Sequence, residues 1–273
     1  MQFNIFLNPE RQLRNFWWVL IFFAVLASML IPSILLTKAE GGKLAIELQA
    51  LLVILTTAIC QRLRSASFFE VCGRIDKTWF KELTWGLLAG AALMLVPAMI
   101  LLLSGLVEFK VNAIDARSLL VSLSLFVAVA ISEELIFHGF LFQRLINGAG
   151  IWVAQIGMSA YFLLNHSDAL RSAGNLGYLA AVNIFIAGLL FGLAYLRTKS
   201  LALPIGIHFA ANMVQGGILG FGVSGSSNSG ILTPIFKHEL PWFTGGQFGL
   251  EASIPGLLAV IALTLFLYVF KKR

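Results

Sequence analysis

The sequence predicts an all-α, polytopic membrane protein of about eight transmembrane helices, forming a single domain over residues 1–273. Composition gives two of the reasons: 59% of the residues are apolar and only 12% are charged, with a mean hydropathy of +0.89. Soluble domains carry about 25% charged residues, so a soluble globule is close to excluded. The third reason is a series of long apolar runs along the chain.

The helices are expected where these runs lie. The hydrocarbon core of a bilayer is about 30 Å thick and needs about 20 mostly apolar residues per helix. Runs bounded by charged residues or by Gly, Pro and Asn clusters lie at roughly 16–36, 44–60, 83–106, 118–145, 151–166, 179–196, 201–221 and 254–270. The first run is too long for a signal peptide and lacks a clean cleavage site, so we expect a retained helix. The fifth is the shortest, and its loss would invert every later helix.

The segments between the runs predict the orientation. An even number of spans places both termini on one side of the membrane. With the amino terminus inside, the outer segments hold six of the 19 Lys and Arg residues, namely Lys38, Lys43, Lys110, Arg117, Arg171 and Lys237. The others lie inside, which favours cytoplasmic termini. The net charge of +6 therefore indicates basic flanks beside membrane lipid rather than affinity for nucleic acid.

Other segments carry little functional signal. We find no repeat and no soluble domain. The longest polar stretch, GFGVSGSSNSG leading into the connection 222–252, is expected to be a flexible loop. Cys60 and Cys72 are too far apart for a CxxC pair and are expected to be unremarkable thiols.

Ionisable residues within a span cost several kcal/mol, which makes each one a functional candidate. The acids well inside an apolar run are Glu133 and Glu134, in the fourth span, which also holds His138. His166 ends the fifth span and His208 lies within the seventh. The remaining histidine, His238, belongs to the long loop and is expected to be solvated.

Helical geometry assigns the two glutamates different directions. Adjacent residues on a helix point about 100° apart, so Glu133 and Glu134 cannot share a face. Glu134 shares its face with His138, four residues later, and these two side chains can pair. Glu133 is then free to point into a cavity between helices. The bland alternative is that the carboxylates only join helices by hydrogen bonds.

Two further pairs present polar groups one helical turn apart. His208 and Asn212 place an imidazole and an amide on one stripe, and Phe162 backs His166. A carboxylate in low dielectric can act as a general base towards water, with an imidazole sharing that water. A second imidazole and an amide N–H can hold an oxyanion. This set suits hydrolysis of an acyl bond by water itself.

The order of these motifs on successive helices resembles the CPBP family of intramembrane glutamic endopeptidases. That family includes the type II CAAX prenyl endopeptidases and bacteriocin-processing or immunity proteins. The likeness covers roughly residues 118–221, which it identifies as the catalytic core around an intramembrane cavity. It implies that Glu133 and His166 activate the water, that His208 and Asn212 stabilise the oxyanion, and that Glu134 pairs with position 138.

Position 138 departs from the family pattern EExxxR. An arginine there would be a permanent cation, whereas His138 titrates near neutral pH, so the supporting pair is expected to be weaker or pH-dependent. Arg144 lies nearly three turns beyond Glu134, too near the cytoplasmic end to substitute. This departure supports the alternative of a non-catalytic scaffold, or of a bacteriocin self-immunity protein that acts by binding a partner.

Other mechanisms fit the sequence less well. A zinc protease would need an HExxH-like pair, which is absent, although Glu133, His166 and His208 leave a metal site open. Asp76, Asp115 and Asp168 lie in connections, which disfavours an aspartyl protease. The GxSG string at 222–225 suggests a serine protease, but no histidine follows it in a later span, so we interpret it as loop. A proton-relaying transporter would more often show two related halves, which are absent here.

The sequence thus predicts an intramembrane endopeptidase with no metal and no cofactor. Its substrate would be a membrane-associated peptide or protein, cut near the membrane surface. We expect it to lie in a bacterial inner (cytoplasmic) membrane, with both termini in the cytoplasm.

Overall fold

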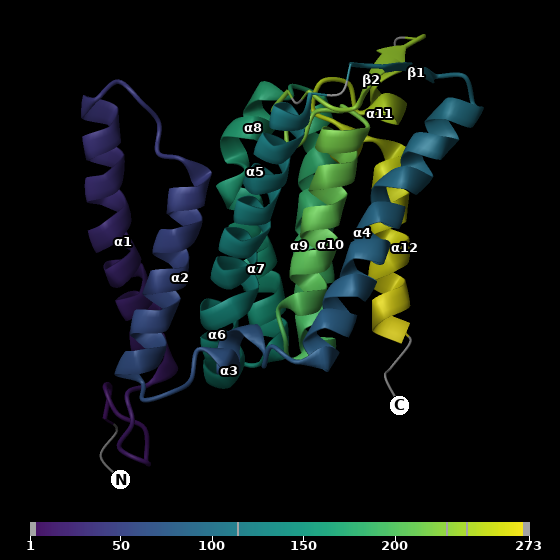
Figure 1. Cartoon of the computed structure of the whole chain (residues 1–273). Coiled ribbons are helices and arrows are strands. Elements are labelled where there is room, and N and C mark those ends of the chain that lie inside the picture. Colours follow the sequence, from purple (N-terminus) through teal and green to yellow (C-terminus); the bar gives the residue numbers. More distant parts are fainter. Residues whose placement is uncertain (1–3, 114, 228, 239, 270–273) are drawn as a thin grey trace.

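The computed structural model describes residues 4–113, 115–227, 229–238 and 240–269, and it confirms an all-α membrane fold (Figure 1). The long helices are α1 (Asn15–Ala39), α2 (Ile46–Leu63), α4 (Lys77–Leu103), α5 (Ala116–Glu134), α6 (Phe140–Ala149), α7 (Ile151–Asn165), α9 (Leu176–Thr198), α10 (Ala202–Asn212) and α12 (Ile254–Val269). Short helices are α3 (Phe69–Cys72), α8 (Ser167–Ser172) and α11 (Pro241–Thr244), with a 3-10 turn at Leu250–Ala252.

Each predicted span coincides with helix. Within the described residues, five helical stretches are long and apolar enough to cross a membrane: α1, α2, α4, α9 and the stretch Ala116–Ala149 that joins α5 to α6. The other three are shorter, with α7 and α12 apolar but under 18 residues and α10 continuing as a π-helix, Met213–Ile218. The count of eight crossings therefore stays a prediction.

The helices alternate in direction, so the start of α1 and the end of α12 lie at the same end of the bundle (Figure 1). This end also holds α3, α6 and the turn between α9 and α10. The predicted even number of passes requires this arrangement. Phe270 and the three basic residues after it, which contributed to the predicted orientation, lie outside the described residues.

The expectation of a flexible loop at 222–252 is wrong for much of that connection. Residues Leu232–Phe236 form strand β2, which pairs antiparallel with β1, Val107–Val111, with Val107 opposite Phe236. Two helical turns follow before α12 begins. The polar composition suggested a loop, but a partner strand more than a hundred residues earlier supplies the backbone hydrogen bonds. This structured connection lies over one end of the bundle (Figure 1).

Close contact between α4 and α10 fixes the position of the helix that carries His208 and Asn212. A Cβ atom on Gly90 would lie 2.2 Å from the carbonyl oxygen of Ile207, and one on Gly206 would lie 2.5 Å from that of Leu83. Only glycine allows the two backbones to approach this closely. Gly86 and Gly90 of α4 lie four residues apart, a spacing of small residues that is typical of tight helix packing in membranes.

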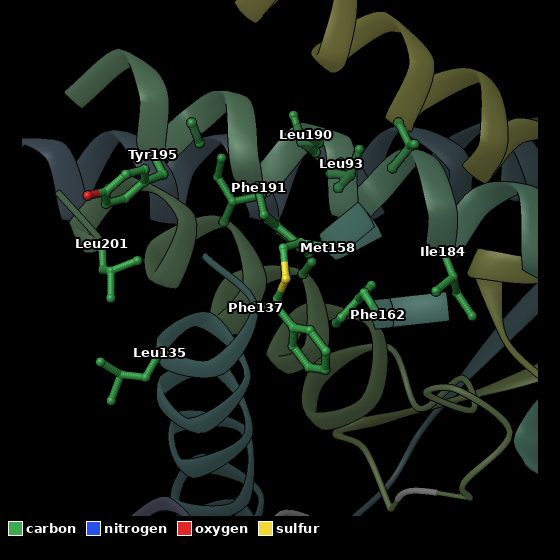
Figure 2. Close-up of a cluster of buried hydrophobic side chains, with 14 of the residues drawn as sticks. Leu93, Leu135, Phe137, Met158, Phe162, Ile184, Leu190, Phe191, Tyr195 and Leu201 are labelled. Atoms are coloured by element: carbon green, nitrogen blue, oxygen red, sulfur yellow. The ribbon is translucent and has the colours of Figure 1, made fainter. Parts of the chain in front are cut away.

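A cluster of buried apolar side chains packs beside the candidate site, and several of its members line the same cavity (Figure 2). The Phe137 and Phe162 rings meet edge to face with centroids 5.0 Å apart, and Phe191 lies 6.1 Å from Phe162. Met158 and Ile184 are buried with them. These side chains come from the segment after α5 and from α7 and α9, so they hold together the helices that carry the candidate site.

Candidate active site

Glu134 is the centre of the polar network. Its side chain is fully buried, and its two oxygens face different histidines: Oε2 lies 2.7 Å from Nδ1 of His138, and Oε1 lies 2.8 Å from Nδ1 of His208. The expected pairing with His138 is therefore present. The second pairing, across to α10, was not predicted because helical spacing says nothing about neighbouring helices.

The hydrogen bonds of His138 define its proton positions. Its Nε2 lies 3.1 Å from the carbonyl oxygen of Gly188, which can only accept, so Nε2 carries a hydrogen. With Glu134 ionised, the Nδ1 atoms of both His138 and His208 donate to it. His138 is 1% exposed, and Glu134 lies between the two imidazoles. This arrangement fixes the ring of His208 and leaves its Nε2 on the cavity side.

The helix changes its winding immediately after Glu134. Residues Leu135–Gly139 are π-helical, and a second π-helical segment, Met213–Ile218, follows Asn212. Such π segments are rare and often occur at functional sites. Each one alters the angular register of the residues after it, so the face that His138 presents could not be taken from ideal α-helical spacing alone.

Glu133 points away from Glu134, as the angular argument predicts. Its side chain is 20% exposed, and its Oε2 lies 3.8 Å from Nε2 of His208. His208 thus lies between the two glutamates, with Nδ1 facing Glu134 and Nε2 facing Glu133. A charge on this ring would be stabilised from both sides.

His166 is the residue that ends α7, and its orientation is well defined. Its Nδ1 lies 2.8 Å from the carbonyl oxygen of Phe162, so Nδ1 carries the hydrogen and Nε2 of the neutral ring is an acceptor. The Phe162 ring packs edge-on against His166 at 4.7 Å, as expected, and Phe191 stacks on His208 at 4.9 Å and 10°. Aromatic rings therefore fix both imidazoles.

These side chains line one cavity of about 240 Å³. Glu133 from α5, His166 from the end of α7, and His208 and Asn212 from α10 all face it, so the structure brings the four candidate catalytic residues together. Liquid water occupies about 30 Å³ per molecule, so the space holds several waters or a short length of peptide. Most of the remaining lining is apolar, as in Leu93, Phe126 and Val260.

Ser224 and Glu251 are among the polar residues of this cavity that sequence reasoning missed. The carboxylate of Glu251 accepts hydrogen bonds from the Ser224 hydroxyl at 2.9 Å and from its backbone N–H at 3.2 Å. Burial raises the pKa of Glu251, against the opposing influence of Ser224 and the nearby His166. Ser224 belongs to the GxSG string that we interpreted as a plain loop, and only the folded connection places it here.

Several other expectations concern residues away from the cavity. Arg144 does not reach Glu134, and it donates instead to Oδ1 of Asn15 at 3.1 Å. Cys60 and Cys72 are free, buried thiols, and His238 is exposed. Among the residues that the structure describes, no three His, Cys, Asp or Glu side chains gather as a metal site requires.

One segment of the chain matches a model of a known protein family, and the same segment carries the candidate site residues. Residues 115–214 match the family model of the type II CAAX prenyl endopeptidases, Rce1-like. The resemblance predicted from the motifs is thereby confirmed at family level. This Rce1-like segment begins at the residue before α5, ends two residues after Asn212, and contains all six candidate site residues. No curated protein and no solved structure matches the chain.

The match supports a CAAX-protease-type membrane endopeptidase at the level of the family. The five long apolar helices make it an integral membrane protein. The non-catalytic scaffold is not favoured by this family assignment. It rested on the missing arginine at position 138, and the structure has His138 pairing with Glu134 in its place.

Proposed function

We propose that this protein is an intramembrane glutamic endopeptidase that cuts membrane-associated peptides or proteins by direct attack of water. One observation carries the proposal: Glu133, His166, His208 and Asn212, from three helices, line one cavity inside the Rce1-like segment. Cytoplasmic termini in a bacterial inner membrane remain part of this proposal.

Attack by water is assigned to Glu133 and His166. Nε2 of neutral His166 accepts one hydrogen of the water, and Glu133 takes the proton as the water oxygen bonds to the scissile carbonyl carbon. The product of this step is a tetrahedral oxyanion and a protonated Glu133.

Stabilisation of that oxyanion is assigned to His208 and Asn212. Glu134 accepts the Nδ1–H of His208, so a protonated ring presents Nε2–H to the cavity, and the Asn212 amide can donate beside it. The tetrahedral carbon then expels the peptide nitrogen, which takes the proton from Glu133. The carboxylate is regenerated, and one water has been added across the C–N bond.

Glu133→Gln tests this assignment, because it removes the base while preserving the shape of the side chain. Purified protein in detergent is given a quenched fluorescent peptide library, with Asp168→Asn as a control that changes an exposed carboxylate in the same way. We expect at least a hundredfold loss of cleavage for Glu133→Gln and none for the control. Retained turnover in Glu133→Gln would refute the mechanism.

Chelation distinguishes the glutamic mechanism from the remaining alternative, a metal-dependent protease. Cleavage that depends on Glu133 and survives EDTA agrees with the glutamic mechanism. Loss of cleavage in EDTA, restored by added zinc, would assign the reaction to the metal class instead.

A further inference from the structure

A second cavity has a volume of about 790 Å³, which is far larger than the cavity of the candidate active site. It is formed by the segment before α1, the first turns of α1, the end of α2 and the end of α6. These elements meet at the end of the bundle that holds the start of α1 (Figure 1). None of the candidate catalytic residues lines it.

Three arginines from three separate segments line this cavity: Arg14, Arg64 and Arg144. None of its lining residues in the described chain is acidic. Arg14 donates through Nε to the carbonyl oxygens of Asn4 and Leu7 and so holds the segment before α1 in place. The cavity therefore concentrates positive charge, with amides and carbonyls as the neighbouring acceptors.

Arg144 is the residue of this cavity that points most clearly to a ligand. The residue is only 7% exposed, yet its buried Nε–H finds no hydrogen-bond partner among the residues that the structure describes. Its Nη1 donates to the neutral amide of Asn15. A buried donor without an acceptor costs about 1–3 kcal/mol, and more when the group is charged. A bound water or ion is one way in which native proteins satisfy such a donor.

Arg64 faces the same region and does not neutralise Arg144. The two guanidinium groups lie 5.9 Å and 5.7 Å from the ring of Phe140, and Arg64 also lies 5.9 Å from the ring of Trp18. Burial lowers the pKa of Arg64, and Glu70 opposes that shift. Glu70 is itself exposed and does not line the cavity. An anion between the two arginines would relieve their mutual repulsion.

The surroundings indicate which anion fits. Phe16 and Leu63 line the same cavity and are 64% and 59% exposed, on helices whose outer faces are apolar. Trp18 is the kind of residue that anchors a helix at the membrane interface. The cavity thus joins a cationic interior to a surface suited to acyl chains. Basic pockets between membrane-spanning helices are typical sites for anionic lipid headgroups.

We propose that this cavity binds the phosphate group of an anionic phospholipid, with the acyl chains lying along α1 and α2. Arg64 and Arg144 donate to the phosphate oxygens, and Nε of Arg144 gains its missing acceptor. Charge-assisted hydrogen bonds from guanidinium to phosphate are among the stronger contacts in proteins. The bound lipid would also hold the α1–α2 hairpin against α6.

Thermal unfolding of the full chain in detergent tests this proposal. Phosphatidylglycerol, phosphatidylcholine and inorganic phosphate are titrated separately, and native mass spectrometry counts retained lipid. We expect a saturable rise in Tm and one retained lipid with phosphatidylglycerol, and neither with phosphatidylcholine. An equal rise with inorganic phosphate would identify a free-anion site and overturn the lipid assignment.

Arg144→Gln and Arg64→Gln are the test variants, and Arg62→Gln is the matched control. Arg62 lies on the last turn of α2, the helix that ends directly before Arg64. It is exposed and does not line the cavity. Each test variant should need about tenfold more phosphatidylglycerol for the half-maximal rise, the factor for one lost contact of about 1.4 kcal/mol. If Arg144→Gln does not fold, Arg64→Gln decides. An equal loss in Arg62→Gln would show diffuse attraction and refute the site.

Discussion

Glu134→Gln should separate folding from catalysis at the centre of the network. The substitution keeps the shape of the side chain and removes its charge. The amide oxygen can still accept from Nδ1 of His208, and the amide N–H can donate to Nδ1 of a neutral His138, whose Nε2 keeps its bond to Gly188. Every buried polar group therefore retains a partner, and we expect the helical fold to persist.

The expected loss concerns the proton on the cavity side of His208. With Glu134 neutral, an imidazolium at His208 loses the nearer of its two carboxylates, so the neutral ring is favoured, with the hydrogen on Nδ1 and a lone pair on Nε2. His208 then offers no donor to the oxyanion. Loss of one oxyanion donor costs about 10²–10³ in kcat, or about 2.7–4 kcal/mol.

Glu134→Ala provides the contrast. It removes both charge-assisted hydrogen bonds, at 2.7 and 2.8 Å, each worth about 1.5–3 kcal/mol, and it leaves two buried imidazoles without an acceptor. The alanine variant should lose several kcal/mol of stability together with activity, whereas the glutamine variant should lose mainly activity. The assay measures Tm and kcat on the same preparations. Unchanged kcat in Glu134→Gln would refute the assigned role of Glu134.

Two further predictions concern helix packing and the cavity rim. Gly206→Ala places a Cβ 2.5 Å from the Leu83 carbonyl oxygen, so α10 must move by about 1 Å. A misplacement of that size costs about 10² in kcat, which is the fall we expect. Gly157→Ala is the control and should leave kcat unchanged, because a Cβ there meets nothing within 4 Å. Equal effects of the two alanines would contradict the packing argument. The pKa of Glu251 is raised above 4.5 by burial, so the native state binds more protons there than the unfolded state does and stability falls as pH rises through that range. Glu251→Gln should flatten this fall in Tm measured from pH 4 to 7, while Asp168→Asn should follow the wild type; a curve for Glu251→Gln that matches the wild type would contradict the assignment.

Local sequence determined the helical elements and the candidate catalytic groups. The apolar runs are long enough to impose helix in a bilayer, because a helix satisfies all its backbone hydrogen bonds within one segment. Buried charge is costly, so Glu133, Glu134 and His208 within such runs marked the site before any contact was known. The spacing of four residues predicted the pairing of Glu134 with His138, and the pair forms although the helix is π-helical between them.

The tertiary structure alone decided how these groups meet. The bond from Glu134 to His208 crosses between two helices, and the contact of Ser224 with Glu251 joins a loop to a residue beyond the next strand. Composition suggested that this loop was flexible, because local composition does not show a partner strand distant in the chain. The glycines that allow close helix contact act through residues that are distant in the sequence, and so do the arginines that come from three segments. Spacing along the chain does not reveal such contacts. The sequence determined which groups the membrane interior must accommodate, and packing decided which of them touch.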